Sequence, residues 1–324
     1  MKLKSTTYKH WVLNYGSKER YVVNMFDIGF KGMSMVESEC LSGGKELRKP
    51  KHVHYVFFKP KWHGITYYTE KYIKESVLDS TKSAFRVCIL TEPRHVQAAA
   101  YAEAERLIDR FDLVLTHEQD ILDRYPDKAR YLMVSCPAIG YSHIRMHEKT
   151  KLVSYMFSKK KITEGHKLRH FMYEKLQDDS RIDFVDYYGS GVGEYIMEKS
   201  PSMDPYMFSI IIENGFKEHY FTEKIMDCFA TGTIPIYKGC PSISKFFNPK
   251  GILTFDTADE LKEILLGLSE GKYFEMLEVA KENYNKVFDF MDPDDIALDE
   301  VRKFILETGF KFKNKSVVKK LKDY

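Results

Sequence analysis

The sequence predicts an α/β protein built on doubly wound parallel sheets, and three observations lead to this prediction. Short apolar runs of strand length alternate with helical patterns from residue 85 onward. Polar or glycine-containing turns follow several of these runs, where an α/β fold places its ligands. The chain has 324 residues, 44% of them hydrophobic, which is enough for two buried cores. We expect domains over 1–145 and 151–290, followed by a C-terminal helix and basic tail over 291–324.

Composition and charge exclude several classes of protein. A net charge of +3 is too small to indicate a nucleic-acid partner, and 30% charged residues favour a soluble surface. The sequence has no uncharged apolar run near the roughly 20 residues that a membrane helix needs, so we expect a cytoplasmic protein without a transmembrane segment. Five scattered cysteines without a CxxC pair favour free thiols, and we expect no metal site.

Residues 1–85 give few clear signals, apart from predicted strands at 21–24 and 53–58. The next stretch is clearer, because 85–90 has the apolar composition of a buried strand and Glu92 follows it. The remaining elements expected in the first domain are a helix at 97–108, a strand at 111–115, a helix capped by Thr116 that ends near 125, and a strand at 131–135.

Residues 136–150 are expected to connect the domains, and a strand at 151–157 opens the second one. A serine- and lysine-rich loop with Ser158 and Lys160 follows, which suits either a phosphate cradle or a basic surface turn. Next come a helix at 166–177, a strand at 182–185 and a turn with Gly189 and Gly191. These glycines fit either a close backbone approach to a nucleotide or a simple turn.

The clearest stretch is 208–239, which predicts a strand, a loop, a helix and a second strand. Its strands are expected at 209–212 and 233–237, and its helix is capped by Thr222 and ends at Gly232. In such a unit, ligands gather where the end of a strand meets the start of a helix, because the free N–H groups there favour anions.

Five polar residues lie in that zone: Glu213, Asn214, Tyr220, Glu223 and Lys224. Carboxylates can accept hydrogen bonds from sugar hydroxyls, and a lysine supplies a point charge suited to phosphate. A solvated loop with a surface ion pair would explain the same residues.

Beyond this stretch, a strand at 251–255 and helices at 258–268, 273–288 and 294–308 are expected. Residues 310–324 contain six lysines and one aspartate. This basic tail is either a solvated end or a peripheral contact with an anionic membrane surface.

The spaced pattern of Glu213-Asn214, the run 220–224 and the run 232–239 resembles the donor-binding signature of the α-1,3/4-fucosyltransferases, glycosyltransferase family 10. The resemblance continues through 240–249. Upstream, Arg169 stands in a Leu-Arg-x-x-x-Tyr context that is similar to the family's donor-binding arginine. The match is weaker over 151–207 and faint before 150, except near Glu92.

The resemblance implies a GT-B type fold with two Rossmann-like domains facing a cleft. It also implies an inverting, metal-independent transfer of a sugar, most simply L-fucose from GDP-fucose, to a hydroxyl of a glycan acceptor, with no cofactor required. Glu92 resembles the family's general base, and Arg169 and Lys224 would neutralise the diphosphate. The residues implied to hold nucleotide and sugar are Tyr220, Glu223, Glu213 and Asn214, with Gly189 close to the nucleotide.

Three alternatives stay open. The loop 158–165 and the insertion 215–219 depart from the family pattern, so the donor could be another nucleotide sugar. The chain could also be a noncatalytic nucleotide- or glycan-binding protein with the same fold. Finally, Glu92 could be a structural carboxylate paired with Arg94. His117 and Glu118 form a second polar cluster after a strand and are reserve candidates for the site.

Overall fold

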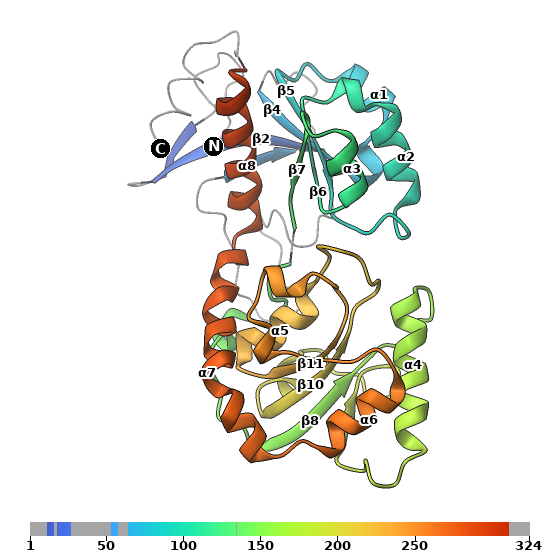
Figure 1. Ribbon diagram of the computed structural model, residues 1–324. Coiled ribbons are helices and arrows are strands. Elements are labelled where there is room, and N and C mark those ends of the chain that lie inside the picture. Colours follow the sequence, from blue (N-terminus) through green and yellow to red (C-terminus); the bar gives the residue numbers. More distant parts are fainter. Residues whose placement is uncertain (1–11, 16–17, 27–52, 58–63, 134, 311–324) are drawn as a thin grey trace. The chain divides into compact units, whose positions relative to one another are not determined.

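The computed structural model describes residues 12–15, 18–26, 53–57, 64–133 and 135–310, with side chains described from residue 64 onward. These residues form two compact α/β units (Figure 1). The first unit contains the described residues up to 133 together with 292–310, and the second contains 135–291. None of the helices in these ranges is both long enough and apolar enough to cross a membrane.

The first unit is built on a sheet with strand order β1-β2-β4-β5-β6-β7, in which β3 also pairs with β2. All of these pairings are parallel except that of β1 with β2. The strands are β1 (Val12–Tyr15), β2 (Lys18–Phe26), β3 (Val53–Phe57), β4 (Ile65–Thr69), β5 (Phe85–Leu90), β6 (Leu113–Thr116) and β7 (Ala129–Tyr131). The helices are α1 (Glu75–Ser80), α2 (Ala98–Arg106), α3 (Gln119–Arg124) and α8 (Pro293–Thr308).

Helix α8 returns to the first unit from the far end of the chain. Its buried side chains, which include Leu298, Val301 and Ile305, share a core with β4, β5 and β6. This packing explains why residues 292–310 do not form a separate C-terminal segment. The unit boundary near 134 also places 135–145 in the second unit, whereas the sequence suggested a first domain that reached 145.

The second unit has a fully parallel sheet with strand order β12-β11-β10-β8-β9. Its strands are β8 (Lys151–Met156), β9 (Val185–Tyr188), β10 (Tyr206–Ile212), β11 (Ile234–Lys238) and β12 (Leu253–Thr254). Its helices are α4 (Glu164–Gln177), α5 (Glu223–Thr231), α6 (Ala258–Leu266) and α7 (Glu270–Val287). After β8 the chain adds β9 on one side and β10 on the other, so the direction of winding reverses between β8 and β10.

The doubly wound α/β class predicted from the sequence is confirmed, but several local expectations are wrong. Strand β9 begins at Val185, where the expected strand at 182–185 ends. Helix α3 has Glu118 at its N-cap without a side-chain cap. Thr116 ends β6 and accepts a hydrogen bond from the Glu118 N–H at 3.2 Å, so it lies too early in the chain to cap the helix. Strand β4 and helix α1 were not predicted, because residues 64–84 lack a clear periodic pattern.

The cysteines in the described part of the chain are free, as expected: Cys88, Cys136, Cys228 and Cys240. The basic tail proposed to contact membranes lies at 311–324, outside the described residues.

The start of α4 packs directly on the end of β10. Gly165, the second residue of α4, donates its N–H to the carbonyl oxygen of Asn214 at 3.2 Å. A Cβ at this position would lie 1.7 Å from the carbonyl oxygen of Glu213. Only glycine therefore allows the helix to approach the strand this closely.

We expect Gly165→Ala to destabilise the protein by about 3 kcal/mol, because the added methyl group collides with backbone that cannot rotate away. Gly271 is the matched control, since it is also the second residue of a helix, and its Cβ would meet nothing closer than the Ser269 hydroxyl at 3.7 Å. Gly271→Ala should leave stability unchanged or slightly raised. Urea denaturation of both variants measures the difference, and equal midpoints would contradict this account.

Candidate functional site

A pocket opens in the second unit at the carboxyl ends of β8 and β10, the point where the winding of the sheet reverses. Its volume of about 430 Å³ suits a small-molecule ligand. Open α/β sheets bind ligands at such a point, because the loops after the two strands diverge and leave a crevice. The residues that line it come from the ends of β8, β9 and β10, from α4 and α5, and from the segment after β9.

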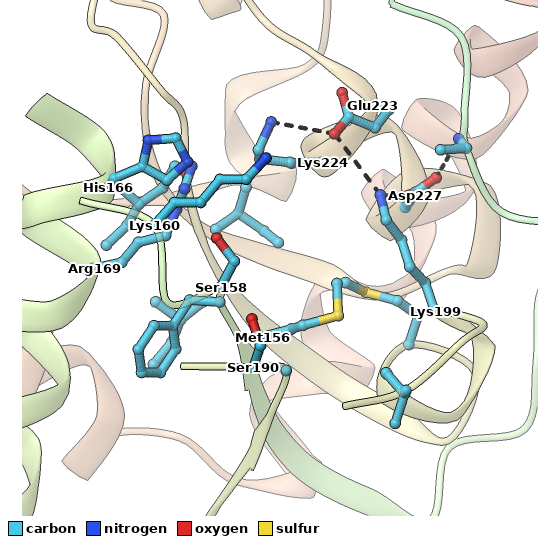
Figure 2. Close-up of a pocket in the computed structure, with 18 of the residues that line it drawn as sticks. Met156, Ser158, Lys160, His166, Arg169, Ser190, Lys199, Glu223, Lys224 and Asp227 are labelled. Carbon is cyan, nitrogen blue, oxygen red and sulfur yellow. Dashed lines mark hydrogen bonds and ion pairs between the residues drawn. The ribbon is translucent and has the colours of Figure 1, made fainter. Parts of the chain in front are cut away.

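Four cationic side chains and two carboxylates line this pocket. In Figure 2, Lys160 and Arg169 lie on one side together with His166, Lys199 lies on the other side, and Lys224 lies between them. The carboxylates belong to Glu223 and Asp227 on α5. The excess of positive charge favours an anionic ligand.

Arg169 is 6% exposed and is held on the end of β10. Its Nε donates to the carbonyl oxygen of Ile212 at 2.8 Å, and one terminal nitrogen donates to the same oxygen and to Asn214 Oδ1, the latter at 3.0 Å. Helix α4 thus places the guanidinium at the pocket, and β10 fixes its orientation. These contacts bring Arg169 and Asn214 together, as the predicted donor site requires.

Glu213 and Thr222 fix the start of α5. The Glu213 carboxylate is fully buried and accepts hydrogen bonds from the Thr222 N–H at 2.9 Å and its hydroxyl at 2.6 Å. Thr222 in turn caps the helix by accepting from the Lys224 N–H, as the sequence predicted. Lys224 Nζ lies 3.2 Å from Glu223 Oε1 and 3.5 Å from Glu213 Oε2. Lys224 therefore reaches the pocket from a helix start that is held on both sides.

Lys199 and Asp227 form an ion pair that the sequence did not predict, in which the carboxylate is fully buried and the lysine side chain is 26% exposed. Lys199 Nζ lies 2.6 Å from Asp227 Oδ2, and Asp227 Oδ1 accepts from the Ala138 and Ile139 N–H groups at 2.7 and 2.9 Å. Burial would lower the pKa of Lys199, but Asp227 and Glu223 outweigh burial and raise it, so the ammonium is charged. The sequence did contain one signal for this ion pair, because Asp227 is the only carboxylate in the otherwise apolar second half of α5.

Burial and the neighbouring cations together set the ionisation states of Glu223 and His166. Burial would raise the pKa of Glu223, but Lys224 and Lys199 outweigh burial and lower it to about 2. Burial lowers the pKa of His166 to about 4, with further contributions from Arg169 and other cations. The imidazole is therefore neutral at pH 7 and accepts the Thr163 N–H at the start of α4. The sequence did not single out His166.

The other predicted donor-site residues divide into two groups. Ser158, Lys160 and Gly189 line the pocket, whereas Tyr220 and Glu213 are buried and are not among the lining residues. Gly189 has φ +97°, and a Cβ there would lie 2.3 Å from the Phe157 carbonyl oxygen. Its need for glycine therefore comes from close packing against the end of β8.

Glu92 belongs to the first unit, on the turn after β5, and its side chain is exposed. The turn is held by the Tyr101 hydroxyl, which donates to the Glu92 carbonyl oxygen at 2.8 Å. Arg94 pairs with Glu105 at 2.9 Å and with Asp120 at 2.8 Å. In the second polar cluster, His117 is 1% exposed and Glu118 precedes α3.

Replacing Lys199 by methionine should destabilise the protein by about 3 kcal/mol at neutral pH, because it leaves the Asp227 carboxylate buried without its cation. Burial then holds the Asp227 pKa above its unfolded value, so the folded state binds a proton first as pH falls. The loss of stability should therefore shrink as pH decreases toward about 4, near the ordinary pKa of aspartate. Denaturation curves at several pH values measure this.

The double variant Lys199→Met/Asp227→Asn is the control, because an amide oxygen can still accept the Ala138 and Ile139 N–H groups. It should recover most of the lost stability. A single variant as stable as the wild type would show that the ion pair contributes nothing.

The part of the chain that carries the pocket is similar to a known protein family. Residues 146–303 match the C-terminal domain of glycosyltransferase family 10 (fucosyltransferase). The Helicobacter pylori α-(1,3)-fucosyltransferase FucT is 31% identical over 115 residues, which cover 34% of this chain and 24% of that protein. The Homo sapiens 4-galactosyl-N-acetylglucosaminide 3-α-L-fucosyltransferase 9 is 26% identical over 140 residues, which cover 43% and 36% respectively. The match therefore spans about a quarter to a third of the length of these relatives.

Solved structures share the fold. A crystal structure of an α1,3-fucosyltransferase aligns with a TM-score of 0.52 and 17% identity, covering 89% of this chain and 92% of that one. Anabaena Alr3699/HepE in complex with UDP-glucose aligns with a TM-score of 0.52 and 11% identity, covering 87% and 99%. The fold is thus the GT-B type of two Rossmann-like units.

The family match contains the spaced donor-binding signature and most of the residues that line the pocket, all of which lie in the second unit. Over residues 146–303 this chain is thus similar to the C-terminal domain of glycosyltransferase family 10 (fucosyltransferase).

Proposed function

We propose that this chain is a glycosyltransferase that moves L-fucose from GDP-fucose to a hydroxyl group of a glycan acceptor. The observation that carries the proposal is the gathering of four cationic side chains in a family 10 pocket at the reversal point of a parallel sheet. A nucleoside diphosphate supplies the negative charge that such a pocket favours. The naming of the relatives as fucosyltransferases supports fucose as the sugar, and a related α1,3-fucosyltransferase was crystallised with GDP.

The proposed reaction is a single displacement that inverts the configuration of the sugar carbon. The acceptor oxygen forms a bond to C1 of fucose while the bond from C1 to the diphosphate oxygen breaks, and GDP leaves with the bonding electron pair. Glu92 is the proposed general base that takes the proton of the acceptor hydroxyl. Arg169 and Lys224 are proposed to stabilise the negative charge that develops on the leaving diphosphate.

The remaining donor contacts follow from the positions of residues around the pocket. Ser158 and Lys160 lie on the loop after β8, where a hydroxyl and an ammonium group can bind phosphate oxygens. Asn214 and Glu223 are proposed to hold the nucleotide and the sugar, because both line the pocket. Glu213 and Tyr220 are buried beside these residues, and we propose that they act by holding the loop and the start of α5.

The proposed reaction needs no cofactor, because cationic side chains take the place of a metal at the diphosphate. We propose no nucleic-acid partner. The cytoplasmic location expected from the sequence stays a prediction, as does contact between the basic tail and a membrane.

GDP should raise the thermal midpoint of the protein by several degrees at saturating concentration, whereas UDP and ADP should not. Lys224→Ala should weaken GDP binding about 10- to 100-fold, because it removes a charged contact with phosphate. Differential scanning fluorimetry and calorimetric titration measure the two effects. Lys281→Ala is the matched control, since Lys281 is also paired with a nearby glutamate, at 2.7 Å, but lies on α7 away from the pocket.

Stabilisation by UDP or ADP instead of GDP would replace the proposed donor with another nucleotide sugar. Unchanged GDP affinity in Lys224→Ala would remove the role of this lysine.

Glu92→Gln should keep GDP affinity and lose transfer activity by at least about 100-fold, because an amide cannot accept the proton. Glu103→Gln is the control, since this glutamate is also exposed on the first unit but pairs with Arg106. Release of GDP from GDP-fucose in the presence of a glycan panel measures activity. Full activity in Glu92→Gln would rule out the base, and GDP binding without turnover in the wild type would favour the noncatalytic alternative.

A further inference from the structure

A second cluster of polar side chains lies at the opposite edge of the second sheet from the pocket. The pocket lies at the carboxyl end of β10, whereas Asp204 comes two residues before that strand begins. His143 ends a short 3-10 turn (Tyr141–His143), and His147 follows four residues later. All three residues belong to the second unit.

The three side chains point their potential metal-binding atoms at one another. His143 Nδ1 lies 2.6 Å from Asp204 Oδ2, and His147 Nε2 lies 3.6 Å from Asp204 Oδ1. His147 Nε2 also lies 2.9 Å from the main-chain carbonyl oxygen of His143, and a metal ion would replace this hydrogen bond. The two imidazole rings are nearly parallel, with an interplanar angle of 19° and centroids 6.1 Å apart. One nitrogen from each ring and one carboxylate oxygen all lie within 4.8 Å of one another.

The Asp204 carboxylate is short of partners for its charge. Its Oδ1 is buried and accepts no hydrogen bond from the described residues. The nearby Lys149 ammonium donates at 2.9 Å to the main-chain carbonyl oxygen of Asp204 and not to its carboxylate. The only ion-pair partners of this carboxylate in the described chain are the two histidines, which compensate its charge only when protonated. A carboxylate with one buried oxygen that lacks a hydrogen-bond donor is stabilised by a cation.

We propose that His143, His147 and Asp204 bind a divalent zinc-type cation. Two imidazole nitrogens and one carboxylate oxygen are a donor set that Zn²⁺ prefers over Mg²⁺ or Ca²⁺, which favour oxygen ligands. With bonds of about 2.0 to 2.2 Å, tetrahedral ligands lie roughly 3.3 to 3.6 Å apart. The distance from His147 Nε2 to Asp204 Oδ1 already has this value, and the distance from His143 Nδ1 to the other carboxylate oxygen, Oδ2, is shorter by up to about 1 Å, so a small rotation of the Asp204 carboxylate is needed.

A water molecule would complete the coordination, since His143 is about one-third exposed. A bound ion would hold residues 143–147 against the start of β10. The proposed metal site does not depend on the proposed transfer reaction.

The sequence carried a signal for this site that was not used. His143 and His147 have a His-x3-His spacing, which is common among zinc ligands, but Asp204 comes from a distant part of the chain. The expectation of no metal site rested on sequence spacing alone, which cannot show a ligand brought in by folding.

The test is a titration of the chelator-treated full chain with Zn²⁺ alone, followed by calorimetry and by thermal unfolding. We expect one equivalent to bind and to raise the thermal midpoint, and excess Mg²⁺ should not compete. Co²⁺ should give the visible absorption bands of a low-coordinate nitrogen and oxygen site without a thiolate charge-transfer band. These wild-type measurements need no variant to fold.

The variants His143→Gln, His147→Gln and Asp204→Asn should each weaken Zn²⁺ binding by at least about 100-fold, because each removes one ligand. His95→Gln is the matched control, since His95 is an exposed histidine of the first unit. Absence of stoichiometric Zn²⁺ binding and of Co²⁺ bands in the wild type would overturn the proposal. Unchanged affinity in the double variant His143→Gln/His147→Gln would also overturn it, by placing the ion elsewhere.

Discussion

The buried carboxylate of Glu213 is the interaction on which the pocket depends. A charge without access to water must find partners within the protein, and Glu213 finds them in the backbone and hydroxyl of Thr222. These bonds join the end of β10 to the start of α5. Gly239 follows β11 and leaves room for this carboxylate, since a Cβ there would lie 2.7 Å from Glu213 Cγ. The spaced signature of the family is therefore one packed unit, in which residues far apart in the motif touch.

The charges around the pocket alternate in sign, and this arrangement prepares the site for an anion. Lys224 is paired with Glu223, Glu223 lies 3.8 Å from Lys199, and Lys199 is paired with Asp227. The cations are thus already oriented and partly desolvated when the chain folds, so a diphosphate meets fixed charges and not mobile ones. Each carboxylate also weakens the field of its neighbour. Among the described residues, no carboxylate lies within ion-pair distance of Arg169 or Lys160. These two cations should therefore contribute most to the preference of the pocket for a ligand of high negative charge.

The sequence could predict those parts of the fold that are determined by residues close to one another in the chain. Helix α5 was predicted with its cap at Thr222 and its end at Gly232, because capping and left-handed termination are local effects. A strand was expected at 182–185 because of its apolar residues, but the strand begins only at Val185. Ile182 is buried although it precedes the strand, so its apolar side chain gave a misleading signal. The Lys199–Asp227 pair and the return of α8 to the first unit depend on contacts across long stretches of chain. No local pattern encodes such contacts, so the motif could not point to Lys199 or Asp227 as residues that line the pocket.

The segment 136–150, expected to be only a connection between domains, supports α5 along its length. A nine-residue helix is marginal without tertiary contacts, so its direction must be fixed from outside. Asp227 binds the backbone of this segment at Ala138 and Ile139, and the Thr231 carbonyl oxygen at the end of the helix accepts from Lys149 Nζ at 2.8 Å and from the His147 N–H at 3.3 Å. The first residues of α5 face the donor pocket, and the last ones touch the segment that carries both histidines. A zinc ion bound there would hold this segment in place and so restrict how far the end of α5 can move.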